Sequence, residues 1–212
     1  MPMNSPRELF LHDLRDIYYV EKQLVQLLPK LAQESSDAEL KRGFTQHHKE
    51  TQRHVKNVEA AFKALGERAS TEECPGFDGL KEEHDEFMQE RPSASVRDMF
   101  LSAAAAKTEH YEISAYTSMV AMARSLGEKR VADLLQKNLS DEKETLRKAQ
   151  AIGRRLGREG AKEQRSATPS RTSSASRSRT GSKRSTSTRS RSTSTGRSTS
   201  RSSSRSRARS TR

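Results

Sequence analysis

Cysteine and long apolar runs are nearly absent from this sequence, and their absence excludes several classes of protein. Cys74 is the only cysteine among the 212 residues, so the chain can form neither an internal disulfide nor a cysteine-rich zinc or iron–sulfur site. The apolar stretches, such as residues 103–106, are far shorter than the roughly 20 residues of a membrane-spanning helix. The first residues also lack the basic and apolar segments of a secretion signal. We therefore expect a cytoplasmic protein with no membrane partner.

Acidic residues are missing from the last quarter of the chain. From Gln164 to Arg212 there are fourteen lysines and arginines but no aspartate or glutamate. The charge of this segment, +14, exceeds the net charge of the whole chain, +12, so the part before it carries about −2. Large apolar and aromatic side chains are absent there too, so no core can form to offset the entropy of ordering. The composition predicts one folded domain over residues 1–160 and a disordered basic tail over residues 161–212.

The first part of the folded domain has the apolar spacing of two helices, each preceded by a capping signal. Ser5 is followed by a proline and, three residues on, by a glutamate, which predicts a capping box for a helix that ends near Gln33. Ser36 also has a glutamate three residues on and predicts a second capping box. The helix that it opens ends near Gly66.

A connection of roughly 30 residues follows, from Gly66 to about Ser95. Its acidic stretch, residues 81–90, predicts one short helix. Beyond it, apolar spacing predicts a third helix over about residues 96–126 and a fourth over about residues 129–157. Gly127 between them supplies a left-handed C-cap and a very short turn.

Two helical hairpins joined by one long connection are typical of ferritin-like bundles, because simple up-down bundles use connections of about 2–8 residues. The sequence therefore predicts an all-α fold, a ferritin-like antiparallel four-helix bundle with a long crossover between its second and third helices. The alternative is a pair of hairpins that complete their core against another subunit, with the crossover as a hinge.

Several glutamates fall in the apolar rows of these helices, where a charged side chain needs a reason. At 3.6 residues per turn, four of them share a face with leucine, isoleucine, valine, tyrosine or alanine: Glu21 in the first helix, Glu109 and Glu112 in the third, and Glu142 in the fourth. Glu50 in the second helix lies at the edge of the apolar stripe, in a row with His47 and His54.

The heights of these glutamates along the bundle follow from their distances to the hairpin turns. Glu21 lies about 15 residues before the first turn and Glu50 about 14 after it, while Glu112 lies about 15 before the second turn and Glu142 about 15 after it. At 1.5 Å per residue, all four are expected near one level. Glu109 is expected one turn away.

Carboxylates gathered inside a bundle cost several kcal/mol each by desolvation, unless they are protonated or neutralised by cations. A pair of divalent metal ions meets this need, and oxygen donors combined with imidazole suit iron or manganese. We therefore expect two such ions per bundle, held by the five glutamates, with His47 or His54 completing the ligand set. The alternative is a metal-free bundle whose inner glutamates are neutral or ion-paired.

Four segments of the chain resemble the YciE/YciF family of bacterial ferritin-like stress proteins: residues 16–24, 47–52, 79–83 and, above all, Glu109-His-Tyr-Glu-Ile-Ser-Ala-Tyr116. The resemblance covers roughly residues 5–155. It implies a rubrerythrin-like fold, a di-iron or similar site, a homodimer and a link to stress responses. By position, the family's acidic residues correspond to Glu21, Glu50, Glu109, Glu112 and Glu142, and its helix-two histidine to His47. Leu146 stands where the resemblance implies an acidic residue. The second metal position would therefore have one ligand fewer than in the family pattern.

Arginines recur in the tail within a matrix of serine and threonine, at intervals that an extended chain can lay along phosphates. The expected contacts to nucleic acid are Arg177, Arg179, Lys183, Arg184, Arg189, Arg191, Arg205, Arg207 and Arg209. Such binding would be non-specific, would weaken steeply with salt and would place the protein at the nucleoid. The alternative is a solubilising tail that touches anionic membranes or acidic proteins.

Two functions from different classes stay open on the sequence. One is a stress protein whose metal site oxidises or sequesters Fe(II) or consumes peroxide, as a di-iron oxidase or peroxidase, while the tail holds it on nucleic acid. The other is a metal-free, helical, nucleoid-associated binding protein.

Overall fold

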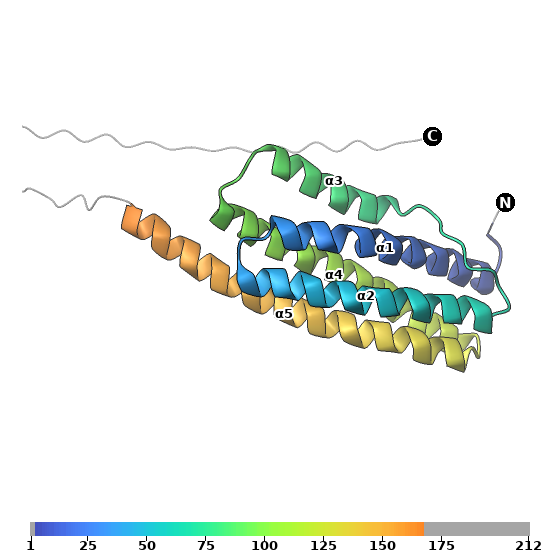
Figure 1. Ribbon diagram of the computed structural model, residues 1–212. Helices are drawn as coiled ribbons and strands as arrows, with labels where there is room; N and C mark the ends of the chain where they lie inside the picture. Colours follow the sequence, from blue (N-terminus) through green and yellow to red (C-terminus); the bar gives the residue numbers. More distant parts are fainter. Residues whose placement is uncertain (1–2, 168–212) are drawn as a thin grey trace, which may run out of the picture. The chain divides into compact units, whose positions relative to one another are not determined.

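The computed structural model describes residues 3–167, which contain five helices and no strand (Figure 1). The helices are α1 (Pro6–Glu34), α2 (Ala38–Ala64), α3 (Pro75–Gln89), α4 (Ala94–Ser125) and α5 (Lys129–Ala167). Four of them are long, and α3 is the short helix expected in the crossover. The tail residues 168–212, with all the predicted nucleic-acid contacts, lie outside the described residues.

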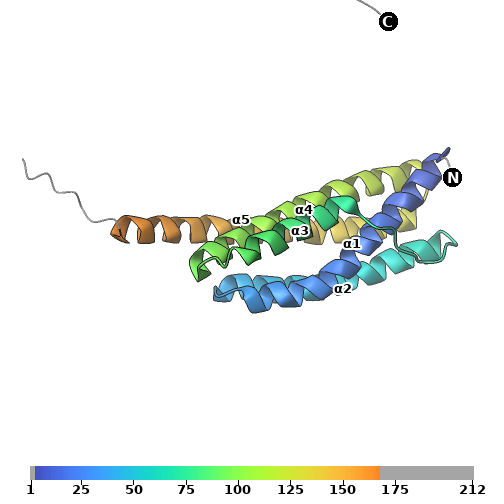
Figure 2. The same cartoon turned by 90° about the horizontal axis from the view of Figure 1, so that it is seen from above.

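The four long helices form a ring in which α1 packs against α2 and α4, and α5 also packs against α2 and α4. Each neighbouring pair runs antiparallel (Figure 1). The crossover helix α3 returns the chain along the bundle, so that α4 starts at the end where α2 starts (Figure 1). Helix α3 lies over the seam between α1 and α4 (Figures 1 and 2). The predicted ferritin-like four-helix bundle with its long crossover is confirmed.

The capping box at the start of α1 is confirmed. The Ser5 hydroxyl accepts a hydrogen bond from the Glu8 amide at 3.2 Å, and the Glu8 carboxylate accepts one from the Ser5 amide at 2.9 Å. The turn between α4 and α5 also forms as predicted, since Gly127 takes a φ of 79° that other residues rarely adopt.

The predicted cap of α2 was wrong by one residue. The N-cap is Asp37, whose carboxylate accepts a hydrogen bond from the Leu40 amide at 2.8 Å and from the Arg155 guanidinium on α5 at 2.7 Å. Ser36 lies before the helix, and its amide donates to the Asp98 carboxylate at 2.9 Å. A carboxylate makes stronger hydrogen bonds than a hydroxyl to the Leu40 amide and to the Arg155 guanidinium. Asp37 therefore takes the capping position.

Helix α3 begins at Pro75, whereas the acidic stretch predicted a start near residue 81. Cys74 is its N-cap, with the sulfur 3.4 Å from the Phe77 amide, and the Phe77 ring is buried. Further along, Phe87 stacks on Phe100 of α4 at a centroid distance of 3.8 Å, and His84 lies 3.0 Å from Glu34 of α1. These contacts hold α3 against two helices of the bundle.

Helix α5 continues about ten residues beyond its predicted end near Gly157 and includes residues that composition assigns to the tail. Glycine inside a helix costs only about 1 kcal/mol relative to alanine, so Gly157 and Gly160 do not stop it. An ion pair between Arg155 and Glu159 at 2.9 Å supports the helix at this point.

Apolar rows from the four long helices fill the interior. Phe10, Leu14 and Ile17 on α1 and Val131 and Leu135 on α5 are at most 1% exposed. Each fully buried side chain of this size stabilises the fold by roughly 1.5–3 kcal/mol. On α1 the apolar row continues past Glu21, so the polar level described below has hydrophobic layers on both sides.

We predict that Asp37→Ala lowers the free energy of unfolding by about 1 kcal/mol, because the α2 amides lose their side-chain acceptor. Urea unfolding followed by circular dichroism measures this change. Ser36→Ala is the matched control and should have a smaller effect, and an equal effect would contradict the assignment of the cap.

The contribution of Asp37 should also depend on pH. Burial raises the pKa of Asp37, but the hydrogen bonds from the Leu40 amide and Arg155 outweigh burial, so the pKa is lowered. The stabilisation is therefore complete above the ordinary aspartate pKa of about 4 and is lost as the pH falls through the lower pKa of the folded state.

Candidate metal centre

Six ionisable side chains meet inside the bundle, and each of the four long helices contributes at least one of them. They are Glu21 from α1, His47 and His54 from α2, Glu109 and Glu112 from α4, and Glu142 from α5, and all are at most 4% exposed. All six are predicted metal ligands, and the structure brings them together.

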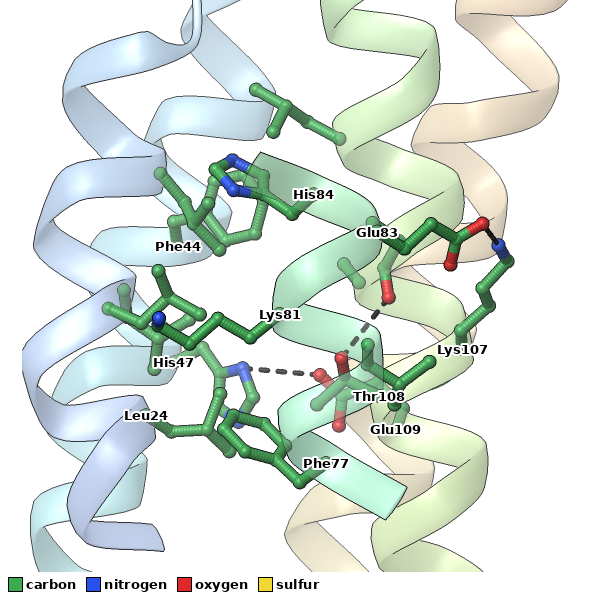
Figure 3. A pocket seen from close by; sticks show the side chains of 17 residues that line it. Leu24, Phe44, His47, Phe77, Lys81, Glu83, His84, Lys107, Thr108 and Glu109 are labelled. Carbon is green, nitrogen blue, oxygen red and sulfur yellow. Dashed lines mark hydrogen bonds and ion pairs between the residues drawn. The ribbon is translucent and has the colours of Figure 1, made fainter. Parts of the chain in front are cut away.

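His47 connects helix α2 with α4 and α5. Its Nδ1 lies 3.2 Å from a carboxylate oxygen of Glu109, and its Nε2 lies 3.4 Å from one of Glu142. Figure 3 shows the His47 ring turned toward Glu109. One oxygen or nitrogen atom from each of four residues lies within 4.8 Å of the others: His47, Glu109, Glu112 and Glu142. We call these four residues the first group.

His54 forms a second group with Glu21 and Glu142, whose candidate ligand atoms also lie within 4.8 Å of one another. Its Nδ1 is 2.8 Å from Glu142 and 3.3 Å from Glu21, and its Nε2 is 3.3 Å from Asp141. Glu142 belongs to both groups. A carboxylate has two oxygens, so Glu142 could contribute a ligand atom to each group.

Charge in this site is unbalanced in favour of the acids. Four glutamates face two imidazoles, so even two imidazolium ions would neutralise only half of the carboxylates. Burial raises the pKa of Glu21, and it raises the pKa values of Glu109 and Glu112 well above the usual range, with the charge of Glu142 adding to the effect. These groups therefore need protons or bound cations.

Glu142 itself has the opposite shift. Burial raises its pKa, but the contacts with His47 and His54 outweigh burial, and the pKa is lowered. Burial lowers the pKa of His54, but Glu142 and Glu21 raise it to about 11. In the metal-free site these shifts favour an ionised Glu142 beside a cationic His54, while Glu109 and Glu112 hold protons most readily. Metal binding to His54 would release its proton from the ligating nitrogen.

Unsatisfied oxygens test whether a metal ion fits. Neither carboxylate oxygen of Glu112 has a hydrogen-bond partner in the part of the chain that the structure describes, and the same holds for one oxygen each of Glu21 and Glu109. Buried polar atoms without partners are rare in folded proteins. Hard oxygen donors together with imidazole are the ligand types that iron and manganese accept, so the residues fit such an ion.

A layer of neutral polar groups supports the second group from behind. The Tyr116 hydroxyl donates a hydrogen bond to Glu21 and accepts one from the Asn138 amide at 2.9 Å. Asn138 also donates to the His54 backbone carbonyl at 3.3 Å and accepts from Asn57 at 2.7 Å. These bonds fix the Glu21 carboxylate and the backbone that carries His54.

Sequence reasoning did not find Asn138 or Asp141. Asn138 lies one turn before Glu142 on the inner face of α5, so a polar residue in that apolar row was the available signal. Asp141 is only partly buried, and its contact with His54 could not be inferred from helical periodicity.

Glu50 lies apart from both groups of candidate ligands. Its side chain is half-buried and accepts hydrogen bonds from Gln46 at 2.9 Å and from Thr145 at 3.3 Å. Helix α2 thus presents two histidines to the centre. Glu109, which is expected one turn from the common level, belongs to the first group together with Glu112.

Two hollows reach the first group from the outside. One, the α3 pocket, lies between α1, α3 and α4 and ends at His47 and Glu109 (Figure 3). Leucines of α1 and Phe77 of α3 form much of its wall, and Lys81 and Lys107 line it as well. The other, the α2–α5 groove, is lined by residues of α2, α4 and α5.

Among residues 3–167, none of the helices combines the length and the apolar character that crossing a membrane requires.

An antiparallel four-helix bundle with a long crossover and a buried carboxylate–imidazole cluster defines a ferritin-like protein. The chain belongs to the DUF892 family, a domain of unknown function whose family model matches residues 5–162. It is 35% identical to protein YciF of Escherichia coli strain K12 over 146 residues, which span 68% of this chain and 88% of YciF. The resemblance to the YciE/YciF family is thereby confirmed.

Solved structures show the same relationship. The E. coli stress protein YciF superposes with a TM-score of 0.71 at 32% identity, covering 74% of this chain and 99% of YciF. YcfI of Rhodopseudomonas palustris gives a TM-score of 0.68 at 37% identity, covering 70% of this chain and 94% of YcfI. A protein of Xanthomonas campestris, with a TM-score of 0.62 at 23% identity over 76% of this chain and 99% of its own, shares the fold.

We predict that Glu112→Gln stabilises the protein in the presence of a chelator and weakens its stabilisation by metal. The substitution keeps the shape of the side chain but removes one of the buried acids that repel one another, so the metal-free bundle should become more stable. The melting temperature with EDTA and with Mn(II) measures both effects.

Glu144→Gln is the matched control, because Glu144 is exposed and pairs with Arg147 on the surface. It should leave the metal-induced rise in melting temperature unchanged. An equal metal-induced rise in the wild type and in Glu112→Gln would argue against Glu112 as a ligand.

Proposed function

We propose that this protein is a ferritin-like stress protein that binds two iron or manganese ions in the bundle and handles Fe(II) or peroxide there. The observation that carries the proposal is the pair of buried groups that share Glu142, with oxygens of Glu112 that lack partners in the described chain. The relationship to YciF, which is described as a stress protein, supports the setting.

The residues divide the work between two positions. His47, Glu109, Glu112 and Glu142 would hold one ion, and Glu21, His54 and Glu142 the other. A bound iron ion would supply one-electron redox chemistry with oxygen or peroxide. The carboxylates neutralise the ions, while the apolar layers around the site limit access of water and strengthen each electrostatic contact.

Protons have acceptors within the same cluster. Asp141 lies 3.3 Å from Nε2 of His54 and is partly exposed, so it connects the buried imidazole with solvent. Tyr116 holds the Glu21 carboxylate through its hydroxyl. If the protein is an oxidase or peroxidase, protons would thus move between the second group and solvent through His54 and Asp141.

Metal content of two variants tests this assignment. The wild type should bind about two ions per chain, Glu21→Ala about one, and Glu142→Ala almost none, because only Glu142 belongs to both groups. Elemental analysis after anaerobic loading with Fe(II) or Mn(II) and desalting gives the stoichiometry, with Glu144→Ala as control.

A wild-type stoichiometry well below one ion per chain, without thermal stabilisation by either metal, would leave the metal-free, nucleoid-associated binding protein as the function. If metal binds, the rate of Fe(II) oxidation by oxygen and by peroxide then separates an oxidase or peroxidase from a protein that only sequesters iron.

The tail supports a second activity, the non-specific binding of nucleic acid. Its fourteen basic residues without a compensating acid are a sequence observation, since this segment lies outside the described residues. The proposal places the protein in the cytoplasm, at the nucleoid. The family resemblance supports a homodimer, whose mass sedimentation velocity would measure.

Truncation after Ala167 tests the tail. Full-length protein should retain double-stranded DNA at 50 mM salt and lose about a thousandfold or more in affinity at 200 mM, as expected for many phosphate contacts. The truncated chain keeps all of α5 and should bind far more weakly. Equal retention by both proteins would remove the nucleic-acid proposal.

A further inference from the structure

The α2–α5 groove is a narrow hollow that leads from the surface to the first group of candidate ligands. Leu40, Phe44, Ala149 and Ile152 give it apolar walls. Two candidate ligands, His47 and Glu109, line it as well, and both are at most 4% exposed. One Glu109 oxygen has no hydrogen-bond partner among the described residues. The groove therefore connects solvent with an unsatisfied buried carboxylate.

Glu50 also lines this groove, and its exposure is intermediate between that of the exposed Lys148 and that of the buried His47 and Glu109. Its two oxygens accept hydrogen bonds from Gln46 of α2 and Thr145 of α5, which are both neutral donors. Within the described part of the chain Glu50 makes no ion pair, so its negative charge is not compensated by a basic side chain. A half-buried carboxylate of this kind attracts a cation.

A divalent cation that moves through an apolar hollow must exchange water for protein ligands. An oxygen ligand partway along the path lowers the free energy of that exchange, because the ion never stands in the apolar region without an anionic partner. Glu50 occupies such a position, and His47 and Glu109 follow deeper in the same groove.

The α3 pocket has less excess negative charge. Lys81 and Lys107 line it together with Glu83 and Glu109, and the lysines pair with Asp85 and Glu83, respectively. In the α2–α5 groove the basic side chain is Lys148, which lies 3.7 Å from Glu144. Of the two hollows, the groove is therefore the better path for a cation, although Lys148 opposes it.

We propose that Glu50 is an uptake carboxylate, which takes a divalent cation from solvent and passes it to His47 and Glu109 without being one of its final ligands. This inference rests on the proposed metal-binding function. It assigns to Glu50 a role in the rate of loading, whereas the two buried groups determine how much metal is bound.

Stopped-flow loading of the full-length protein with Co(II) tests this role, because the visible absorption of cobalt changes when it enters a carboxylate–imidazole site. Glu50→Gln keeps the shape of the side chain and one of its two acceptor oxygens, and the Thr145 hydroxyl can accept a hydrogen bond from the new amide group. It should slow loading about tenfold, which corresponds to roughly 1.4 kcal/mol in the barrier, while the final cobalt stoichiometry equals that of the wild type.

Two further variants make the test specific. Lys148→Gln removes the opposing charge from the groove and should accelerate loading severalfold. Glu83→Gln makes the same charge change as Glu50→Gln, but in the α3 pocket, and should leave the rate unchanged. A role of Glu50 in folding alone would not produce rate changes of opposite sign at Glu50 and Lys148.

Three results would overturn the inference. Unchanged loading in Glu50→Gln would exclude the uptake role, and slower loading in Glu83→Gln alone would assign the path to the α3 pocket. A lower final stoichiometry in Glu50→Gln would make Glu50 a permanent ligand. Absence of cobalt uptake by the wild type itself would instead refute the proposed metal-binding function.

Discussion

The buried carboxylate of Glu142, held between His47 and His54, is the interaction that organises the interior of the bundle. Its contacts with the two imidazoles connect α5 to α2, and the surrounding glutamates of α1 and α4 complete the same polar level. This arrangement is unfavourable for a bare protein, because desolvated acids repel one another. The apolar layers on both sides must therefore supply the stability that the polar level lacks, which is a common trade between function and stability.

Much of this architecture could be predicted from the sequence, because the α-helix has both a fixed number of residues per turn and a fixed rise per residue. Helical spacing identified the inner faces on which Glu21, Glu112 and Glu142 lie, and residue counts from the hairpin turns gave their common height. The rotation of a helix about its own axis was less certain. Glu50 stands at the edge of its stripe, where a small rotation decides between the interior and a surface groove, and the structure turns His47 and His54 inward instead.

Details that depend on individual hydrogen bonds could not be derived from spacing. Asp37 rather than Ser36 caps α2 because Arg155, more than a hundred residues later in the chain, reaches the same carboxylate. The role of Asn138 could not be predicted from spacing, because its partners are Tyr116 on α4 and a backbone carbonyl on α2. Such contacts depend on how the helices pack.

The length of α5 has a consequence for the ligand cluster. From Glu142 to Ala167 the helix rises by about 38 Å, at 1.5 Å per residue. The end of α5 therefore lies far along the helix axis from the level of the buried carboxylates. About seven turns of helix thus lie between the buried carboxylates and Ala167, so the last turns of α5 can vary in sequence without altering the geometry of the ligand cluster.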